Sequence, residues 1–138
     1  MTEPNHHRLA SACLAGLIIA AGLGVRTLWD GAVSNFVGVA LWDALVCCLI
    51  VLLRPDVSPR SLLIVGALVG IGTEVLQATG VPLELYRAHP LLSLVFGTTF
   101  QWADMPAYPV GAALAAAGQA SSLRRSRRTA EVVDCRGR

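Results

Sequence analysis

The stretch Gly97-Thr-Thr-Phe-Gln-Trp-Ala-Asp-Met-Pro-Ala-Tyr-Pro-Val-Gly111 is the part of the chain around which the fold is organised. It places three aromatic side chains, one carboxylate and two prolines directly before an apolar, alanine-rich run. Three earlier apolar runs each precede or carry a few polar residues. We therefore expect the fold to bring polar residues of the earlier segments to this stretch, at one face of a membrane.

The composition indicates an integral membrane protein. Of 138 residues, 54% are hydrophobic and 14% are charged, and the mean hydropathy is +0.60. Soluble domains carry about 25% charged residues. The apolar excess is concentrated in runs long enough to cross a bilayer, which takes about 20 mostly apolar residues. All eleven basic residues are arginine, which is typical of a GC-rich bacterial genome.

The apolar runs predict a four-helix bundle of the all-α class in a single domain, residues 1–120. The predicted spans are residues 9–25, 33–53, 61–79 and 104–120. The second and third are separated by Arg54–Arg60, whose two prolines cannot continue a helix. Leu91–Phe96 is apolar but too short to cross, so we predict an interfacial or re-entrant segment before the last helix. The basic tail, residues 121–138, is predicted to be disordered.

The arginines predict the orientation. With four spans, both termini and the Arg54–Arg60 turn lie on the same side of the membrane. That side carries nine arginines, and the other side carries only Arg26 and Arg87. Because cytoplasmic loops are enriched in basic residues, we expect a bacterial plasma-membrane protein with both termini in the cytoplasm. Most aromatic residues fall at the opposite, outer face.

The third span carries a polar stripe. Gly66, Gly70, Glu74 and Gln77 recur at helical spacing and therefore share one face. A Gly-x-x-x-Gly pair lets another backbone approach closely, either within the chain or in a homo-oligomer. An acidic side chain in hydrocarbon costs about 2.5–3.5 kcal/mol, so it marks a candidate functional site. The alternative is that Glu74 hydrogen-bonds backbone or Gln77 and only fixes the helix register.

Two further carboxylates belong to the candidate site. Asp43 lies on the second span, roughly 15 Å below the outer helix end, and Asn35 lies on the same stripe of that span, two turns nearer the outer end. Asp104 lies at the outer mouth, and Tyr108 follows one turn later. We expect these acids and Glu74 to line one cavity that opens outward. Asp43 could instead be structural, and Asp104 could also cap the last helix.

Arg87 and Trp102 complete the candidate ligand-binding set. A guanidinium fork suits a phosphate or carboxylate headgroup. Arg87 could equally pair with Glu84, three residues earlier, at little energetic gain. Trp102 would hold the apolar part of a ligand. The basic tail predicts contact with anionic membrane lipids and not with nucleic acid. No nucleotide-binding motif and no metal-ligand spacing is present, so neither a cofactor nor a metal is predicted.

The chain resembles a family of small bacterial membrane proteins known as domain of unknown function 2809, distantly similar to VanZ-like proteins. The resemblance is carried by Glu74-Val-Leu-Gln77, Arg87 and the stretch from Gly97 to Gly111, within roughly Gly22 to Ala117. Many relatives have Gly-Asp where this chain has Gly38-Val39. The resemblance implies a membrane bundle and supplies no activity.

Three functions remain open from these observations. The first is binding, without catalysis, of a lipid-linked or amphiphilic ligand in an outward polar pocket. Its predicted residues are Glu74, Gln77, Arg87, Trp102, Asp104, Tyr108 and Asp43. The second is a small proton-coupled transporter using Glu74 and Asp43. The third is an intramembrane hydrolase using Glu74 and Asp104, for which no nucleophile or catalytic residue is evident.

Overall fold

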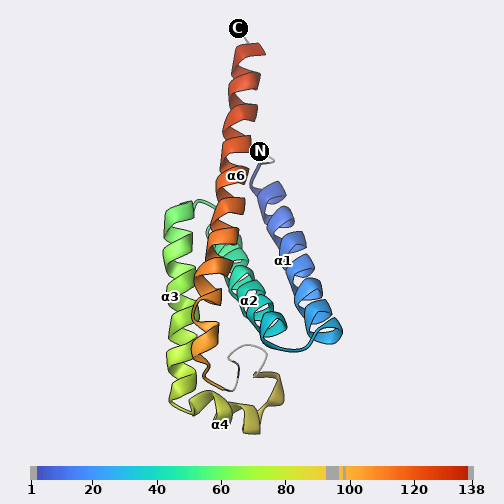
Figure 1. Cartoon of the computed structure of the whole chain (residues 1–138). Helices are drawn as coiled ribbons and strands as arrows, with labels where there is room; N and C mark the ends of the chain where they lie inside the picture. The colour runs from blue at the N-terminus through green and yellow to red at the C-terminus, as the bar shows by residue number, and fades with distance from the viewer. Residues whose placement is uncertain (1–2, 93–96, 98, 137–138) are drawn as a thin grey trace.

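The computed structural model describes residues 3–92, 97 and 99–136, and this part of the chain is helical without strands. The all-α class is therefore confirmed. The long helices of the described residues are α1 (Glu3–Leu28), α2 (Ala32–Leu53), α3 (Pro59–Ala78) and α6 (Ala107–Arg136) (Figure 1). The short elements are α4 (Val81–Ala88) and the 3₁₀ turns η1 (Pro90–Leu92) and η2 (Trp102–Asp104).

The turn between α2 and α3 follows directly from the local sequence. α2 ends at Leu53, and α3 begins at Pro59 behind an N-cap serine. The Ser58 hydroxyl accepts a hydrogen bond from the Ser61 backbone N–H at 3.0 Å, which satisfies one of the free N–H groups of the first turn. Proline at the first helical position loses no hydrogen bond. The turn predicted at Arg54–Arg60 therefore covers residues 54–58, and its last two residues, Pro59 and Arg60, already belong to α3.

α6 packs between α2 and α3, and close backbone approach makes this possible (Figure 1). A Cβ atom added to Gly111 would collide with the carbonyl oxygen of Ala40 on α2. On α3, a Cβ atom at Gly66 would collide with Cys47, and one at Gly70 with the ring of Tyr108. The Gly66/Gly70 pair therefore makes close contacts within the chain, to Cys47 and Tyr108.

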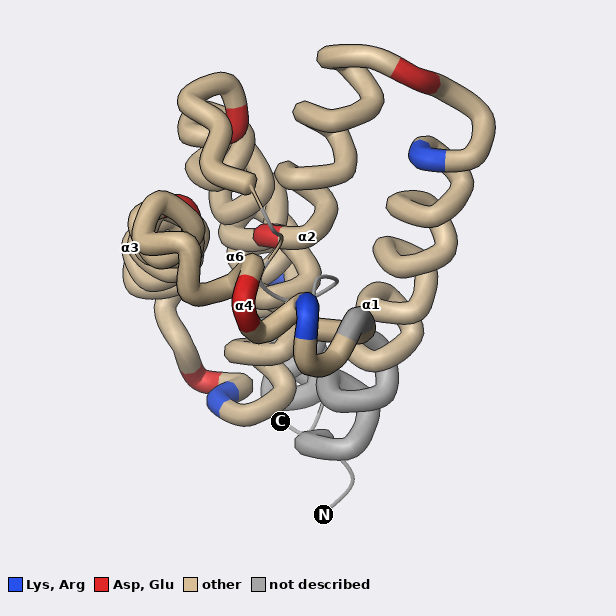
Figure 2. The backbone as a smooth tube through the Cα atoms, turned by 90° about the horizontal axis from the view of Figure 1, so that it is seen from below, with Lys and Arg blue, Asp and Glu red and all other residues tan. Residues whose placement is uncertain are grey.

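α1 stands apart from α3 and α6. It packs mainly against α2, and the view along the bundle places α2 between α1 and α3 (Figure 2). Its side chains Leu17 and Leu23 are 68% and 60% exposed. The space between the α1–α2 pair and the α3–α6 pair is where the candidate site lies.

The first and last helices differ most from their predicted bounds. The first runs from Glu3 to Leu28, where residues 9–25 were predicted. The last helix begins at Ala107 after the η2 turn, and it continues to Arg136 instead of giving way to a disordered tail. The reason is local, because no glycine or proline interrupts residues 119–136, and alanine, leucine and arginine favour helix. Of the predicted re-entrant segment Leu91–Phe96, only Leu91 and Leu92 are described, in η1, and residues 93–96 lie outside the described residues.

Within the described residues, two helices are long and apolar enough to cross a membrane, α2 and α3. α1 has a shorter apolar part, Ala12–Leu28. The short helix α4 was not predicted. It begins with Val81 and Pro82 behind Gly80, whose φ of 78° lies in the left-handed region that glycine adopts readily.

Candidate functional site

Glu74 joins three parts of the chain. Its carboxylate accepts a hydrogen bond from the Tyr108 hydroxyl at 2.7 Å and from the backbone N–H of Gln101 at 3.1 Å. Glu74 is 1% exposed. The α3 helix, the stretch before η2 and the first turn of α6 are thus connected through one buried side chain near the C-terminal end of α3.

Gly70 determines where Tyr108 lies. The ring of Tyr108 occupies the space that a side chain on residue 70 would fill. Because Glu74 lies one helical turn further along α3, the phenol hydroxyl of Tyr108 reaches the Glu74 carboxylate. The ring of Trp42 on α2 meets Tyr108 edge to face, with the ring centroids 6.2 Å apart. The glycine stripe therefore positions a hydrogen bond as well as a helix contact.

Asp104 is held from the opposite side by α2. The Asn35 side-chain amide donates to Asp104 Oδ1 at 2.6 Å. Burial raises the pKa of Asp104, and the neighbouring negative charge of Glu74 raises it further, whereas the bond from Asn35 lowers it. Asp104 and Glu74 are therefore close enough to repel each other when both are ionised.

A cavity of about 770 Å³ opens beside these two carboxylates. Its apolar wall comes from α1 and α2, and includes Ile18, Leu23, Leu41, Trp42 and Leu45. Its polar side comes from α2, α3, the segment before η2, and α6. This side includes Asn35, Thr73, Gln101 and the predicted site residues that the next paragraph names. Sites that bind small molecules are commonly such concave, mostly apolar spaces with a few convergent polar groups.

Four of the seven predicted site residues line this cavity: Glu74, Gln77, Asp104 and Tyr108. Gln77 lies against Gly97, since a Cβ atom on that glycine would collide with the Gln77 amide. Gly97 has a φ of 64°, so the same position also favours glycine for its backbone conformation. The sequence pattern thus located the polar side of the cavity.

Arg87 and Trp102 do not line the cavity. Arg87 lies on α4, where its guanidinium forms an exposed ion pair with Glu84 at 2.7 Å. This is the surface alternative that the spacing left open. Trp102 is 77% exposed and stacks edge to face on Phe100, with 4.9 Å between the ring centroids. Both residues were expected to hold a ligand, and helix α4 and the η2 turn direct them outward instead.

Asp43 is buried in a different place from the other two acids. It is fully buried among α2, α3 and α6 beside Gly66 and Gly111, and it is not part of the cavity lining. Neither carboxylate oxygen makes a hydrogen bond of normal geometry with a described residue, although the Ala112 backbone faces it. The expectation that all three carboxylates line one cavity is therefore wrong for Asp43.

Sequence reasoning missed three cavity residues. Asn35 was noted only as a member of the α2 stripe, and its partner Asp104 lies 69 residues away. Arg26 and Asp30 line the mouth of the cavity at and just after the end of α1. Arg26 and Arg87 were both assigned to the outer side, and only the packing of α1 on α2 distinguishes them. Helical spacing grouped Asn35 with Asp43, which does not line the cavity, so spacing alone could not identify Asn35 as a cavity residue.

The family comparison agrees with the resemblance. Residues 28–112 match the model of a family described as "Protein of unknown function (DUF2809)". The chain belongs to this family. No curated protein and no solved structure matches the chain. The family segment contains the three buried carboxylates and Tyr108, whereas most of α1, and with it one wall of the cavity, lies outside it.

The cavity offers binding chemistry more readily than catalysis. The two carboxylates are already hydrogen-bonded to neutral donors, namely a phenol, a backbone N–H and a side-chain amide. No cysteine and no histidine lines the cavity among the described residues. The hydroxyls of Ser34 and Thr73, which also line it, donate to the backbone carbonyls of Val25 and Val69. The described residues contain no group of three His, Cys, Asp or Glu side chains that could hold a metal ion.

Proposed function

We propose that this member of the family is a multi-pass membrane protein that binds an amphiphilic ligand in the cavity. The observation that carries the proposal is the composition of the cavity itself. One wall is apolar, and the opposite side holds Glu74, Asp104 and Tyr108. An amphiphile presents the same two kinds of surface on one molecule, and a lipid-linked molecule would do so as well.

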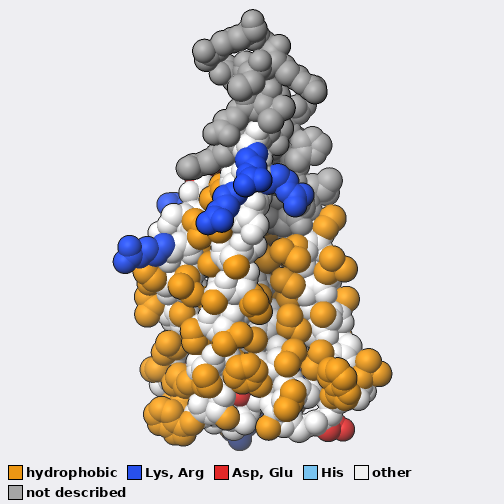
Figure 3. All heavy atoms as spheres, turned by 45° about the horizontal axis from the view of Figure 1, so that its top comes forward, with side chains coloured by type: hydrophobic (Ala, Val, Ile, Leu, Met, Phe, Trp, Pro, Cys, Tyr) orange, Lys and Arg blue, Asp and Glu red, His pale blue; other side chains and the backbone are white. Residues whose placement is uncertain are grey.

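The exposed surface supports a membrane location for all four long helices. Large apolar side chains point outward along α1, α3 and α6, for example Leu17, Leu68 and Leu114, which are 68%, 63% and 64% exposed. Figure 3 shows hydrophobic side chains over the visible face of the helices. Large contiguous apolar surfaces are rare on soluble monomers. A bilayer would cover this surface on every side.

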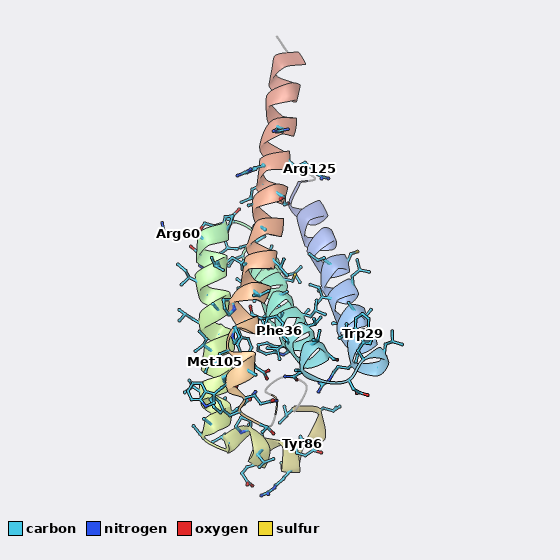
Figure 4. All side chains as sticks on the ribbon, viewed as in Figure 1. Trp29, Phe36, Arg60, Tyr86, Met105 and Arg125 are labelled. Atoms are coloured by element: carbon cyan, nitrogen blue, oxygen red, sulfur yellow. The ribbon has the colours of Figure 1, made fainter. Side chains whose placement is uncertain are left out.

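The charges support an orientation with the cavity facing outward. Exposed arginines gather where α2 ends, α3 begins and α6 continues upward, and these are Arg54, Arg60, Arg124, Arg125 and Arg128. Figure 4 places Arg60 and Arg125 towards one end and Trp29 and Tyr86 towards the other. Trp29 lines the cavity. With the basic end in the cytoplasm, the cavity opens towards the outer leaflet of a plasma membrane.

The proposal is tested by native mass spectrometry of the purified protein in a mild detergent. We expect a reproducible adduct of a co-purifying amphiphile. Gly38→Phe should abolish the adduct, because Gly38 lines the cavity and has open space at its Cβ position, so the ring would fill the site. The acids and their hydrogen bonds are left in place.

The matched control is Gly72→Phe on α3. Gly72 also has open space at its Cβ position but does not line the cavity. This variant should retain the adduct. If wild-type protein carries no adduct, or if Gly38→Phe retains it at wild-type occupancy, the proposed function is wrong.

The transporter and hydrolase hypotheses have less support. A proton relay from Glu74 to Asp43 would require a shared path, and Asp43 does not line the cavity. A hydrolase would require a nucleophile next to Glu74 and Asp104. Ser34 and Thr73 line the cavity, but their hydroxyls donate to the backbone carbonyls of Val25 and Val69 and not to either acid.

A further inference from the structure

We infer that the ligand of this cavity is a cationic amphiphile, an organic ammonium group on an apolar chain. The inference rests on the proposed function and specifies the ligand that the same cavity takes. It replaces the phosphate or carboxylate headgroup for which Arg87 had been considered, because Arg87 lies outside the cavity in an ion pair with Glu84.

The first argument is the charge at the base of the cavity. Glu74 and Asp104 are 1% and 5% exposed, and the groups that hydrogen-bond them carry no charge. Two neighbouring carboxylates without a cation are costly in an apolar environment. Among the described lining residues the only basic one is Arg26, which is exposed at the mouth together with Asp30. A cation brought by the ligand would compensate the charge at the base.

The second argument is the way in which Asp104 is held. Its Oδ1 accepts a hydrogen bond from the neutral side-chain amide of Asn35 on α2. Asp104 is nine-tenths buried and lines the cavity. A buried carboxylate that a neutral amide holds at the edge of a cavity is a suitable partner for an ammonium group.

The third argument is the size and character of the walls. A cavity of about 770 Å³ is far larger than a single inorganic cation requires. Three aromatic residues line it: Trp29, Trp42 and Tyr108. Aromatic faces attract organic ammonium groups, and the attraction is larger where water is excluded. The apolar side chains of α1 and α2 then provide the surface for an alkyl chain.

The experiment compares three ligands with one chain length and different headgroups. Decyltrimethylammonium, decyl maltoside and decyl sulfate are added to the protein in nanodiscs of phosphatidylcholine, and binding is followed by tryptophan fluorescence. Trp29 and Trp42 report from the cavity wall. We expect the ammonium compound to bind about tenfold more tightly than the sulfate, as a close charge pair would produce. Empty nanodiscs and Gly38→Phe correct for partition into lipid.

The variant Asp104→Asn tests the acid directly. It keeps the size of the side chain and removes its charge, so ammonium binding should weaken at least about fivefold more than maltoside binding. Asp56→Asn is the matched control, because Asp56 is an exposed acid in the turn between α2 and α3 and should leave all three affinities unchanged. The wild-type headgroup series remains decisive if Asp104→Asn does not fold.

The outcomes separate the inference from the proposed function. Saturable binding of the maltoside or the sulfate at equal or higher affinity than the ammonium compound would overturn the cationic ligand and leave an amphiphile site. Binding of the ammonium compound that is unaffected by Gly38→Phe would also overturn it. Absence of saturable binding for all three compounds, together with no native adduct, would overturn both.

Discussion

Two regions of this bundle bury carboxylates in opposite ways. In the cavity region, formed by Glu74, Asp104 and Tyr108, each acid accepts hydrogen bonds from a different segment of the chain. In the crossing region, formed by Asp43, Gly66 and Gly111, the acid is fully buried and its oxygens have no hydrogen-bond partner of normal geometry among the described residues. The helices approach closely there because glycines leave room.

The difference shows that burial alone does not identify a ligand site. Glu74 and Asp43 have nearly the same exposure, yet only Glu74 faces an open space with convergent polar groups. Asp43 lies where backbones are in contact, and no ligand could enter without separating the helices. The surroundings of each acid, and not its depth, indicate what it does.

The largest effect on stability is expected from adding a side chain where the helices cross, in the crossing region. Gly111→Leu places a side chain against the Ala40 carbonyl, which is backbone and cannot move aside. Overpacking of this kind should destabilise the fold by about 3 kcal/mol or more. Gly118→Leu on the same helix is the control, because nothing lies near its Cβ position. Thermal unfolding in detergent measures both, and equal melting temperatures would contradict the close α2–α6 contact.

The second effect concerns the hydrogen bonds of the cavity region. Glu74→Ala leaves the Tyr108 hydroxyl and the Gln101 N–H without their acceptor. Leaving buried donors unsatisfied should cost about 1–3 kcal/mol. Glu84→Ala removes an acid from an exposed ion pair and should change the melting temperature little. If the two variants were equally stable, Glu74 would not connect the three segments.

A third test uses the pH dependence of ligand binding to examine Asp104 in the cavity region. Because burial and the Glu74 charge raise the pKa of Asp104, this acid becomes negative only at a higher pH than an ordinary aspartate. Binding of the permanently charged decyltrimethylammonium should therefore strengthen as pH rises through that raised value. Glu74, Tyr108, Arg26 and Asp30 face the same cavity. The comparison of wild type with Asp104→Asn isolates the Asp104 contribution.

The raised pKa of Asp104 affects the stability of the fold in the opposite direction from ligand binding. A folded-state pKa above the unfolded value means that the folded protein holds the proton more tightly. The stabilisation from Asp104 is therefore fully present below the unfolded pKa and is lost as pH rises through the folded pKa. A binding curve that weakened with rising pH, or one that Asp104→Asn left unchanged, would exclude Asp104 as the partner of the cation.

A smaller effect is expected at Asp43. Asp43→Asn keeps the shape of the side chain and breaks no hydrogen bond of normal geometry, so stability should change by less than about 1 kcal/mol. Ammonium binding should stay at the wild-type value. A folded variant that lost proton-linked uptake in vesicles would instead favour the transporter hypothesis and give the crossing region a role of its own.

The smallest effect is expected at Arg87. Its exposed pair with Glu84 should contribute about 0.2–1 kcal/mol, and the residue lies outside the cavity. Arg87→Ala should therefore leave both the melting temperature and amphiphile binding close to wild type. Loss of the native adduct in this variant would show that Arg87 contributes to ligand binding after all.

Residues that share a helix face could be placed from the sequence. The spacing of Gly70, Glu74 and Gln77, and of Asp104 and Tyr108, depends only on the helical repeat, and the structure brings these residues around one cavity. The same repeat also grouped Asn35 with Asp43. It could not show that one of them reaches Asp104 whereas the other points into the contact between helices.

The sequence by itself determined the helical class, the turn between α2 and α3, and the side of the bundle that carries the acids. These depend on apolar runs, prolines and helical periodicity, which are local properties of the chain. Only the tertiary structure decided that Arg26, and not Arg87, lines the cavity, that Trp102 points outward, and that Asp43 is separate. Those outcomes depend on which helix packs against which, and such contacts join residues far apart in the chain.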